Sequence, residues 1–158
     1  MTAFLSVFFR YNEVMSEFHF FHPVEVRYGD LDAQRHVNNA KYLTYLEQAR
    51  LEYVRQLGLW DGETFAELGM IVAEVQITYR APIHFGQAVR VGVRVARLGN
   101  KSMLMEYQLE NAQDGGLFAS ATSVQVAYDY QVGKSMPVPE LWRKKIAAYE
   151  GIVEKGNP

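Results

Sequence analysis

The sequence predicts an α+β domain in which an antiparallel sheet wraps around one long helix. The first observation is the segment 39–57, where apolar residues recur every three or four positions, as on the buried face of a helix. The second is a change of period downstream, where apolar and polar residues alternate as in half-buried antiparallel strands. Because the helix carries apolar residues on more than one side, it is expected to fill the hollow of a curved sheet.

The N-terminal half of the predicted domain contains one short strand and the long helix. The strand covers 23–28 and belongs at a sheet edge, because Pro23 has no N–H to donate to a neighbouring strand. Asn38 or Asn39 suits the helix N-cap, and Gly58 stands where a C-terminal cap belongs. The buried stripe of this helix is expected to contain Tyr42, Leu46, Ala49, Tyr53 and Leu57, widened by Leu43 and Val54.

The C-terminal half is predicted to supply the rest of the sheet and a short final helix. Hairpin connections are expected at 99–100 and at 114–116, and two prolines precede a helix over 141–149. A single sheet leaves an open edge, which a second copy of the chain is expected to cover. The strands themselves are expected over 71–79, 89–95, 103–109 and 124–130.

Composition narrows the class of protein. The chain has 158 residues, of which 49% are hydrophobic and 22% charged, which fits one globular domain with a real core. Its net charge of −2 provides no basic field for nucleic acid, and no basic amphipathic segment suits a membrane surface. Without cysteine there is no disulfide, thiolate metal ligand or cysteine nucleophile, which is compatible with a cytoplasmic protein. We expect an N-terminal extension over 1–17, either disordered or docked as an added strand, one domain over 18–150 and a tail over 151–158.

The segment 27–39 concentrates the groups that could perform chemistry. It reads RYGDLDAQRHVNN and ends where the long helix begins. The start of a helix has backbone N–H groups without intrahelical partners, so a nearby Asp could attack or hold an electrophile while those groups stabilise an oxyanion. Asp32 is the candidate carboxylate, and His36 and Gln34 could donate a hydrogen bond or orient a water. This arrangement points to acyl chemistry.

Each loop residue also has a structural interpretation. Asp32 could cap a turn, His36 could bond to the backbone, and Gln34 could be an exposed loop side chain. We interpret Asp30 as a turn-stabilising residue, and the two asparagines that follow the loop as caps or loop braces. His84 is isolated near a turn.

Polar residues outside the loop are assigned mainly structural roles. Tyr42 is expected in the core with its hydroxyl near the site. Glu47 is expected to pair with Arg50, one turn further along the helix. His19 and His22 have a loose metal-like spacing but no third ligand at a useful separation, so no zinc site is expected.

Three stretches of the chain carry a family pattern. They read RYGDLDAQRHVNNAKYLTYLEQAR, ITYRAPIHFGQAVRV and RLGNKSMLMEYQL, in that order. Together they resemble the hotdog-fold acyl-CoA thioesterases of the 4-hydroxybenzoyl-CoA thioesterase type, over about residues 23–149. The HVNN form is also similar to bacterial long-chain acyl-CoA thioesterases and to plant acyl-carrier-protein thioesterases. The resemblance implies a hotdog fold, an acyl-CoA or acyl-carrier-protein substrate and no metal or redox cofactor. It also implies a homodimer, or a tetramer built from dimers, with active sites between protomers.

The resemblance implies roles for individual residues. Asp32 matches the catalytic carboxylate of the G-D-x-D motif, acting as nucleophile on the thioester carbonyl or as general base on a water. Gln34 and His36 fall on two further motif positions of the acyl-carrier-protein branch, where Gln34 replaces an asparagine. Many bacterial members carry a glycine in place of Arg35. The expected oxyanion donors are the backbone N–H groups of His36 and Val37.

The implied CoA site extends beyond the loop. Arg80, which follows the strand over 71–79, is a candidate for binding substrate, as is Tyr42. In the family a hairpin approaches the CoA phosphates, and basic and hydroxyl groups suit that contact. The corresponding residues here are Arg97, Asn100, Lys101 and Ser102.

Two other functions stay open at this point. A hotdog hydratase or dehydratase also uses an Asp and a His, usually in a D-x4-H loop beside Asn-Pro. Here three residues separate Asp32 from His36, and no proline is present in the loop. A non-catalytic module could bind acyl-CoA or an acyl carrier protein, although an intact Asp32 argues against lost turnover. The HVNN branch favours fatty acyl over hydroxybenzoyl substrates, but the motif does not specify the acyl group.

Overall fold

The computed structural model describes residues 18–64 and 68–153. The N-terminal extension expected over 1–17 lies outside these residues. The described chain contains six strands, two α-helices and one short 3-10 turn. In chain order these elements are β1 (Phe20–Val24), η1 (Tyr28–Asp30), α1 (Asn39–Gln56), β2 (Met70–Tyr79), β3 (Val89–Leu98), β4 (Ser102–Asn111), β5 (Leu117–Asp129), β6 (Lys134–Ser135) and α2 (Glu140–Glu150).

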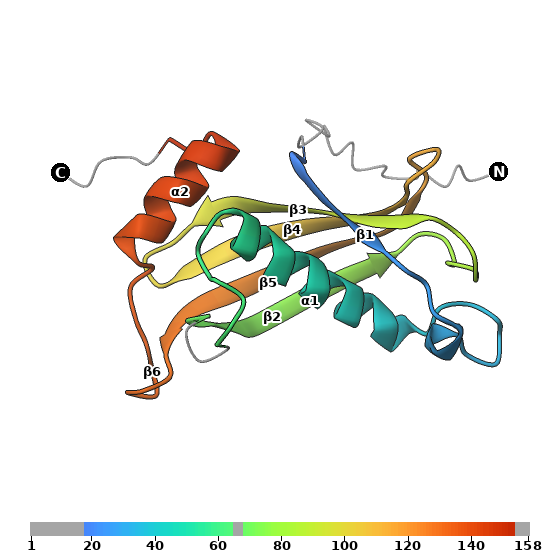
Figure 1. The fold of residues 1–158 in the computed structure, drawn as a ribbon, viewed down its shortest axis with the longest axis horizontal. Helices are drawn as coiled ribbons and strands as arrows, with labels where there is room; N and C mark the ends of the chain where they lie inside the picture. Colours follow the sequence, from blue (N-terminus) through green and yellow to red (C-terminus); the bar gives the residue numbers. More distant parts are fainter. Residues whose placement is uncertain (1–17, 65–67, 154–158) are drawn as a thin grey trace, which may run out of the picture.

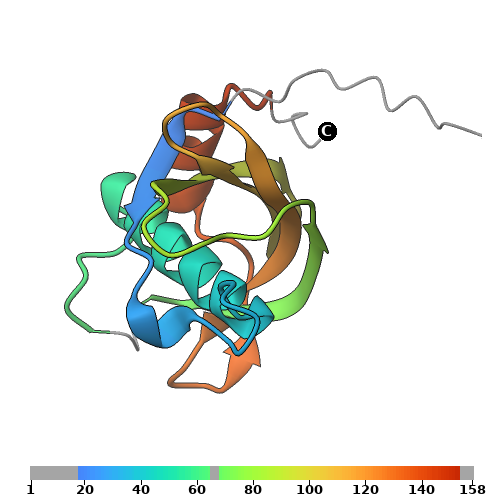
Figure 2. The same cartoon turned by 90° about the vertical axis from the view of Figure 1, so that its right-hand side faces the viewer.

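One antiparallel sheet curves around α1, as the sequence predicts (Figure 1 and Figure 2). Its strand order is β1-β3-β4-β5-β2, and the short β6 pairs with β5. Alternate residues of the strands point into the hollow that α1 occupies and form the core. This is the hotdog arrangement that the resemblance implies. The completely buried members of this core include Val91, Val93, Val95, Met105 and Leu109 of the sheet, and Ala49 and Tyr53 of α1.

The limits of α1 agree with its sequence signals. Asn38 is the N-cap, and its Oδ1 accepts a hydrogen bond from the Ala40 N–H at 2.9 Å. Gly58 has a φ of 64°, the left-handed conformation that commonly ends a helix. Leu43, expected to widen the buried stripe, is instead 45% exposed. The prediction that the helix is covered on that side is therefore wrong for the single protomer.

Two strands differ in their limits from the predicted ones. β1 runs over 20–24 rather than 23–28, because the chain turns at η1, where the Asp30 N–H donates to the Arg27 carbonyl at 3.0 Å. β5 begins seven residues before its predicted start. Its first half consists largely of alanine, serine and threonine, so its hydrophobic alternation is weak even though Ala119 is completely buried. A strand whose core-facing residues are small therefore shows too little alternation of hydrophobicity to be predicted from the sequence.

The concave side of β2 is not covered by the described residues. A bulge after Val72 shifts the register, so that Val72 and Val75 both face inward, opposite Gln125 and Ser123 of β5. Even so, Val72 is 45% exposed and Val75 is 38% exposed. Together with Leu43 of α1 they form an apolar surface at the open edge of the sheet.

The second helix, α2, lies at one end of the sheet, and α1 begins at the other end (Figure 1). Trp142 and Ile146 are its buried residues, and Glu150 accepts a hydrogen bond from the Tyr53 hydroxyl of α1. This helix therefore anchors the C-terminal part of α1. Within residues 18–64 and 68–153, no helix is long and apolar enough to cross a membrane.

Candidate active site

The loop between η1 and α1 forms a tight turn that holds Asp32. The Asp32 N–H donates to the His36 carbonyl at 2.9 Å, and the Arg35 N–H donates to the Asp32 carbonyl at 3.0 Å. The Asn38 N–H donates to the Asp30 carbonyl at 2.8 Å, which joins the two ends of the loop. Arg35 has a φ of 63°, a conformation that favours glycine. The glycine that the family resemblance implies at this position would suit the same turn.

Asp32 has the turn-capping role that the sequence allowed and also borders a cleft. Its Oδ1 accepts a hydrogen bond from the Gln34 N–H at 2.8 Å, which forms an Asx turn. The half-buried side chain also lines an open cleft of about 480 Å³ at the start of α1. Gln34 and His36 line the same cleft, so the structure brings together the three catalytic candidates. Tyr42 and Arg80 are further lining residues.

His84 lies beside His36, although the sequence shows it only as an isolated residue near a turn. The two residues form an isolated antiparallel bridge, and their ring centroids are 4.8 Å apart in an edge-to-face arrangement. His84 also lines a second hollow that shares Asp32 with the cleft. No local signal could reveal this contact, because it depends on how the segment after β2 returns to the loop.

The backbone N–H groups of the loop are not equally available for an oxyanion. The Val37 N–H donates to the Ile83 carbonyl at 2.8 Å, so the structure removes Val37 from the expected donors. For His36, no backbone donor bond is found among the described residues. Asn39 is the first residue of α1 and lines the cleft. Its N–H belongs to the helix turn without intrahelical acceptors, which makes it a further candidate donor that the sequence analysis did not name.

Asp30 has the structural role expected of it. Its buried carboxylate accepts hydrogen bonds from the Tyr45 hydroxyl at 2.8 Å and from the Arg27 N–H at 3.0 Å. Lys41 Nζ lies 3.6 Å from the other oxygen. Burial opposes ionisation, but these two hydrogen bonds and the lysine charge outweigh it and hold the pKa of Asp30 below its ordinary value. The ionised carboxylate therefore ties the loop to α1.

Two tyrosines form the wall of the cleft between α1 and β2. The rings of Tyr42 and Tyr79 are 5.0 Å apart and edge-to-face, and the Tyr79 hydroxyl donates to the Asn39 carbonyl at 3.2 Å. Burial, with a smaller contribution from Tyr79, raises the pKa of Tyr42. The Tyr42 hydroxyl therefore stays protonated and can donate a hydrogen bond to a bound group. Arg80, directly after β2, places a cation at this wall.

The β3–β4 hairpin is far from the Asp32 cleft within one protomer. It lies at the end of the sheet next to α2, whereas the cleft lies at the other end of α1 (Figure 1). The Asn100 carbonyl accepts from the Val138 N–H at 2.9 Å, and Lys101 Nζ is 3.5 Å from Ser135 Oγ. A single protomer therefore does not join Arg97, Asn100, Lys101 and Ser102 to the catalytic candidates.

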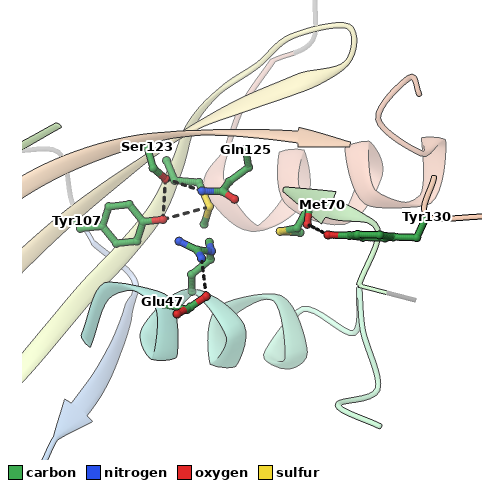
Figure 3. Close-up of polar contacts among 8 residues, drawn as sticks. Glu47, Met70, Tyr107, Ser123, Gln125 and Tyr130 are labelled. Carbon is green, nitrogen blue, oxygen red and sulfur yellow. Dashed lines mark hydrogen bonds and ion pairs between the residues drawn. The ribbon is translucent and has the colours of Figure 1, made fainter. Parts of the chain in front are cut away.

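Glu47 and Arg50 form the helix-face ion pair that their spacing predicts. Arg50 Nη2 lies 3.7 Å from Glu47 Oε1. The two partners differ sharply in environment, because the Arg50 side chain is 9% exposed and that of Glu47 is 63% exposed. Arg50 therefore lies largely out of solvent and lines a small cavity together with Tyr107 and Ser123 of the sheet. Figure 3 shows Glu47 on α1 and the side chains of Tyr107 and Ser123 on the sheet that faces the helix.

Comparison with known proteins connects this geometry to one family. A family model described as the thioesterase-like superfamily matches residues 26–146. The long-chain acyl-CoA thioesterase FadM of Escherichia coli strain K12 is 26% identical over 123 residues, covering 78% of this chain and 93% of the relative. The acyl-CoA thioesterase YbgC of Haemophilus influenzae is 31% identical over 118 residues, covering 73% of this chain and 84% of the relative.

A solved structure of similar fold contains a bound coenzyme. The thioesterase of Thermus thermophilus, complexed with coenzyme A and Zn, superposes with a TM-score of 0.76 at 36% identity. The match covers 86% of this chain and 98% of that one. The likeness therefore extends over nearly the whole described domain.

Proposed function

The chain belongs to the thioesterase-like superfamily, and we propose that it hydrolyses acyl-CoA thioesters to a carboxylic acid and the CoA thiol at the Asp32 cleft. One observation supports placing the proposed reaction at particular residues. A half-buried carboxylate, an imidazole and the start of a helix border one open cleft. Thioester hydrolysis needs an attacking group and donors for the oxygen that becomes negative, and these elements supply both.

Asp32 is proposed to start the reaction in one of two ways. As a nucleophile, its carboxylate attacks the thioester carbon, the C–S bond breaks, and water then hydrolyses the mixed anhydride to acid and free carboxylate. As a general base, it takes a proton from a water that attacks the same carbon, and the proton passes to the leaving thiolate. The N–H groups of Asn39 and His36 are proposed to hold the oxyanion. His36 and Gln34 are proposed to orient the carbonyl or the water.

The proposal extends to assembly. The uncovered concave side of β2, with Val72, Val75 and Leu43, is an apolar surface that a second copy of the chain would cover. A dimer or a tetramer built from dimers would also bring a hairpin that is remote in one protomer to the cleft of its partner. The residues proposed to bind CoA phosphates in this way are Arg97, Asn100, Lys101 and Ser102, with Arg80 of the cleft itself.

The decisive experiment compares wild type with Asp32→Asn on short, long and aromatic acyl-CoAs, measured by thiol release. Asparagine keeps the Asx-turn acceptor and removes only the charge, so kcat should fall by about 100-fold or more. Asp114→Asn is the matched control, because Asp114 makes the same turn with the Gly116 N–H, in the β4–β5 hairpin. Absence of thiol release from every substrate would overturn the activity, and an active Asp32→Asn would overturn the residue assignment.

A heavy oxygen isotope tests for the anhydride. During repeated turnover in labelled water, the isotope enters the Asp32 carboxylate only if Asp32 forms an anhydride that water opens at the Asp32 carbonyl carbon. Peptide mass spectrometry of the recovered enzyme detects this label. Loss of enoyl-CoA absorbance without thiol release would instead indicate hydration.

A further inference from the structure

The imidazole of His36 borders the Asp32 cleft without a hydrogen bond to hold it. Among the described residues, its ring nitrogens have no hydrogen-bond or ion-pair partner. The side-chain torsion χ2 of histidine has broad minima, so a ring without such a bond does not keep one plane. A neutral imidazole has one N–H donor and one acceptor nitrogen, and their directions turn with the ring. To orient a carbonyl or a water, His36 therefore needs another contact that fixes its ring plane.

His84 provides such a contact. The two ring centroids are 4.8 Å apart, and the ring planes meet at 87°. In an edge-to-face arrangement the electropositive edge of one ring lies against the electronegative face of the other. Rotation of the His36 ring about χ2 would lose this contact. The His84 ring therefore favours one plane of the His36 ring.

The backbone on both sides of His84 is anchored. On one side, the Ile83 carbonyl accepts a hydrogen bond from the Val37 N–H at 2.8 Å, and the Ile83 side chain is completely buried. On the other side, the His84 N–H donates to Gln87 Oε1 at 2.7 Å, and the Gln87 N–H donates to the His84 carbonyl at 3.3 Å. His84 is therefore carried by a turn that is attached both to the core and to the loop that holds Asp32.

The backbone of His36 is fixed independently of its ring. Its carbonyl accepts a hydrogen bond from the Asp32 N–H at 2.9 Å, and the residue forms an isolated antiparallel bridge with His84. Substitution of either side chain leaves the backbone groups that make these bonds in place. Removal of the His84 ring can therefore change the orientation of the His36 ring without releasing Asp32 from its turn.

The position of His84 indicates that it acts through His36. Among the described residues that line the Asp32 cleft, His36 is present and His84 is not. His84 lines the second hollow, which shares only Asp32 with the cleft. It is also an exposed residue, so its ring contributes little to the core. The contact by which the His84 side chain can influence the cleft is its contact with the His36 ring.

We propose that His84 is a positioning residue, which holds the His36 ring in the plane in which that ring meets the thioester carbonyl or the attacking water. The inference rests on thioester hydrolysis at Asp32 and adds to it a residue outside the cleft. A group displaced by about 1 Å can cost about 100-fold in rate, so the hold on His36 matters to the reaction. Loss of the His84 ring lowers kcat, because fewer bound substrates meet a correctly oriented His36. The contacts that bind the substrate stay, so KM is unchanged.

The experiment is a double-mutant cycle between the two histidines. His84→Ala should lower kcat for an acyl-CoA substrate by about tenfold with KM unchanged. His84→Phe keeps an aromatic ring and should recover most of that loss. In a His36→Ala background, His84→Ala should lower kcat no further, because the ring that it positions is gone. His19→Ala is the matched control and should leave kcat unchanged, because His19 makes its edge-to-face contact with Tyr149 of α2, at the other end of the sheet.

Nuclear magnetic resonance of the histidine rings tests the same contact without turnover. The chain has four histidines, so the His36 ring signal is identified by its absence from the spectrum of His36→Ala. Relaxation of the ring carbon–proton bonds should show more motion of the His36 ring in His84→Ala than in wild type. In His84→Phe it should stay close to wild type. Equal relaxation in wild type and His84→Ala would overturn the positioning role, even if variants at His36 are too slow to assay.

The outcomes separate this inference from the proposed function. If wild type releases thiol and His84→Ala keeps full kcat, the positioning role is wrong while the thioesterase activity stands. The same conclusion follows if the loss caused by His84→Ala persists in the His36→Ala background, or if only KM changes. If wild type releases no thiol from any acyl-CoA, the proposed function itself fails, and the relaxation of the His36 ring still decides whether His84 holds it.

Discussion

At the scale of single residues, Asp30 and Asp32 are two carboxylates of one motif that differ in burial and in hydrogen bonding. Asp30 is buried and accepts hydrogen bonds from the Tyr45 hydroxyl and the Arg27 N–H. Asp32 makes one local turn bond and faces the cleft. Their spacing alone could place both side chains on one side of an extended chain. The 3-10 turn at η1 and the following bridge separate them instead.

The lowered pKa of Asp30 predicts how stability depends on pH. An acid whose pKa is lower in the folded state stabilises the fold above the unfolded value, about 3.9 for Asp, and this contribution is lost as pH falls through the lower folded value. Asp30→Asn should therefore lose about 1–3 kcal/mol of unfolding free energy at neutral pH. The difference from wild type should shrink below about pH 4. Urea titrations from neutral to acidic pH measure it, and a difference independent of pH would contradict the ionic role.

At the scale of elements, α1 provides both the core and the border of the cleft. The side chain of its N-cap residue Asn38 accepts a hydrogen bond from the Ala40 N–H. The Asn38 N–H in turn donates to the Asp30 carbonyl. The start of the helix and the loop that holds Asp32 are therefore fixed by the same residue. Asn39, which begins α1 and lines the cleft, depends on that fixed start for its position.

Removing this cap should weaken the helix and the site together. Asn38→Ala should lower the free energy of unfolding by about 1 kcal/mol, because the Ala40 N–H loses its acceptor. Asn38→Ser keeps a capping oxygen and should recover most of the loss. Chemical denaturation measures both variants, and kcat should fall in Asn38→Ala more than in the serine variant. Equal stability of wild type and Asn38→Ala would show that the cap contributes nothing.

Sequence patterns foresee elements better than they foresee contacts between elements. The limits of α1 follow from local signals at Asn38 and Gly58, and the Val-rich alternation of β3 is equally local. The meeting of His36 with His84 depends on a bridge between distant segments, and the position of Gln125 depends on the register of β5. Loop motifs therefore identified the cleft, while the His36–His84 contact and the inward position of Gln125 depend on the fold.

At the scale of the whole molecule, the uncovered side of β2 predicts association. Light scattering should give a mass of two or four times 18.1 kDa for the wild type. Val72→Lys places a charge on this surface and should shift the mass toward one chain. Val132→Lys, at an exposed valine in the β5–β6 turn, is the control and should leave the mass unchanged. A monomeric wild type would contradict the proposed assembly.

The bulge in β2 divides the strand into two parts whose inward-facing residues are set separately. Because the register shifts after Val72, apolar residues on either side of the bulge face the same interior. Deleting one residue there while the bulge is kept would move Val72 into the bulge and turn Ile71 inward, opposite Gln125, while Tyr79 stayed opposite Ala119. Insertions and deletions at this point would therefore alter the apolar surface beside α1 and leave the cleft end of β2 in register.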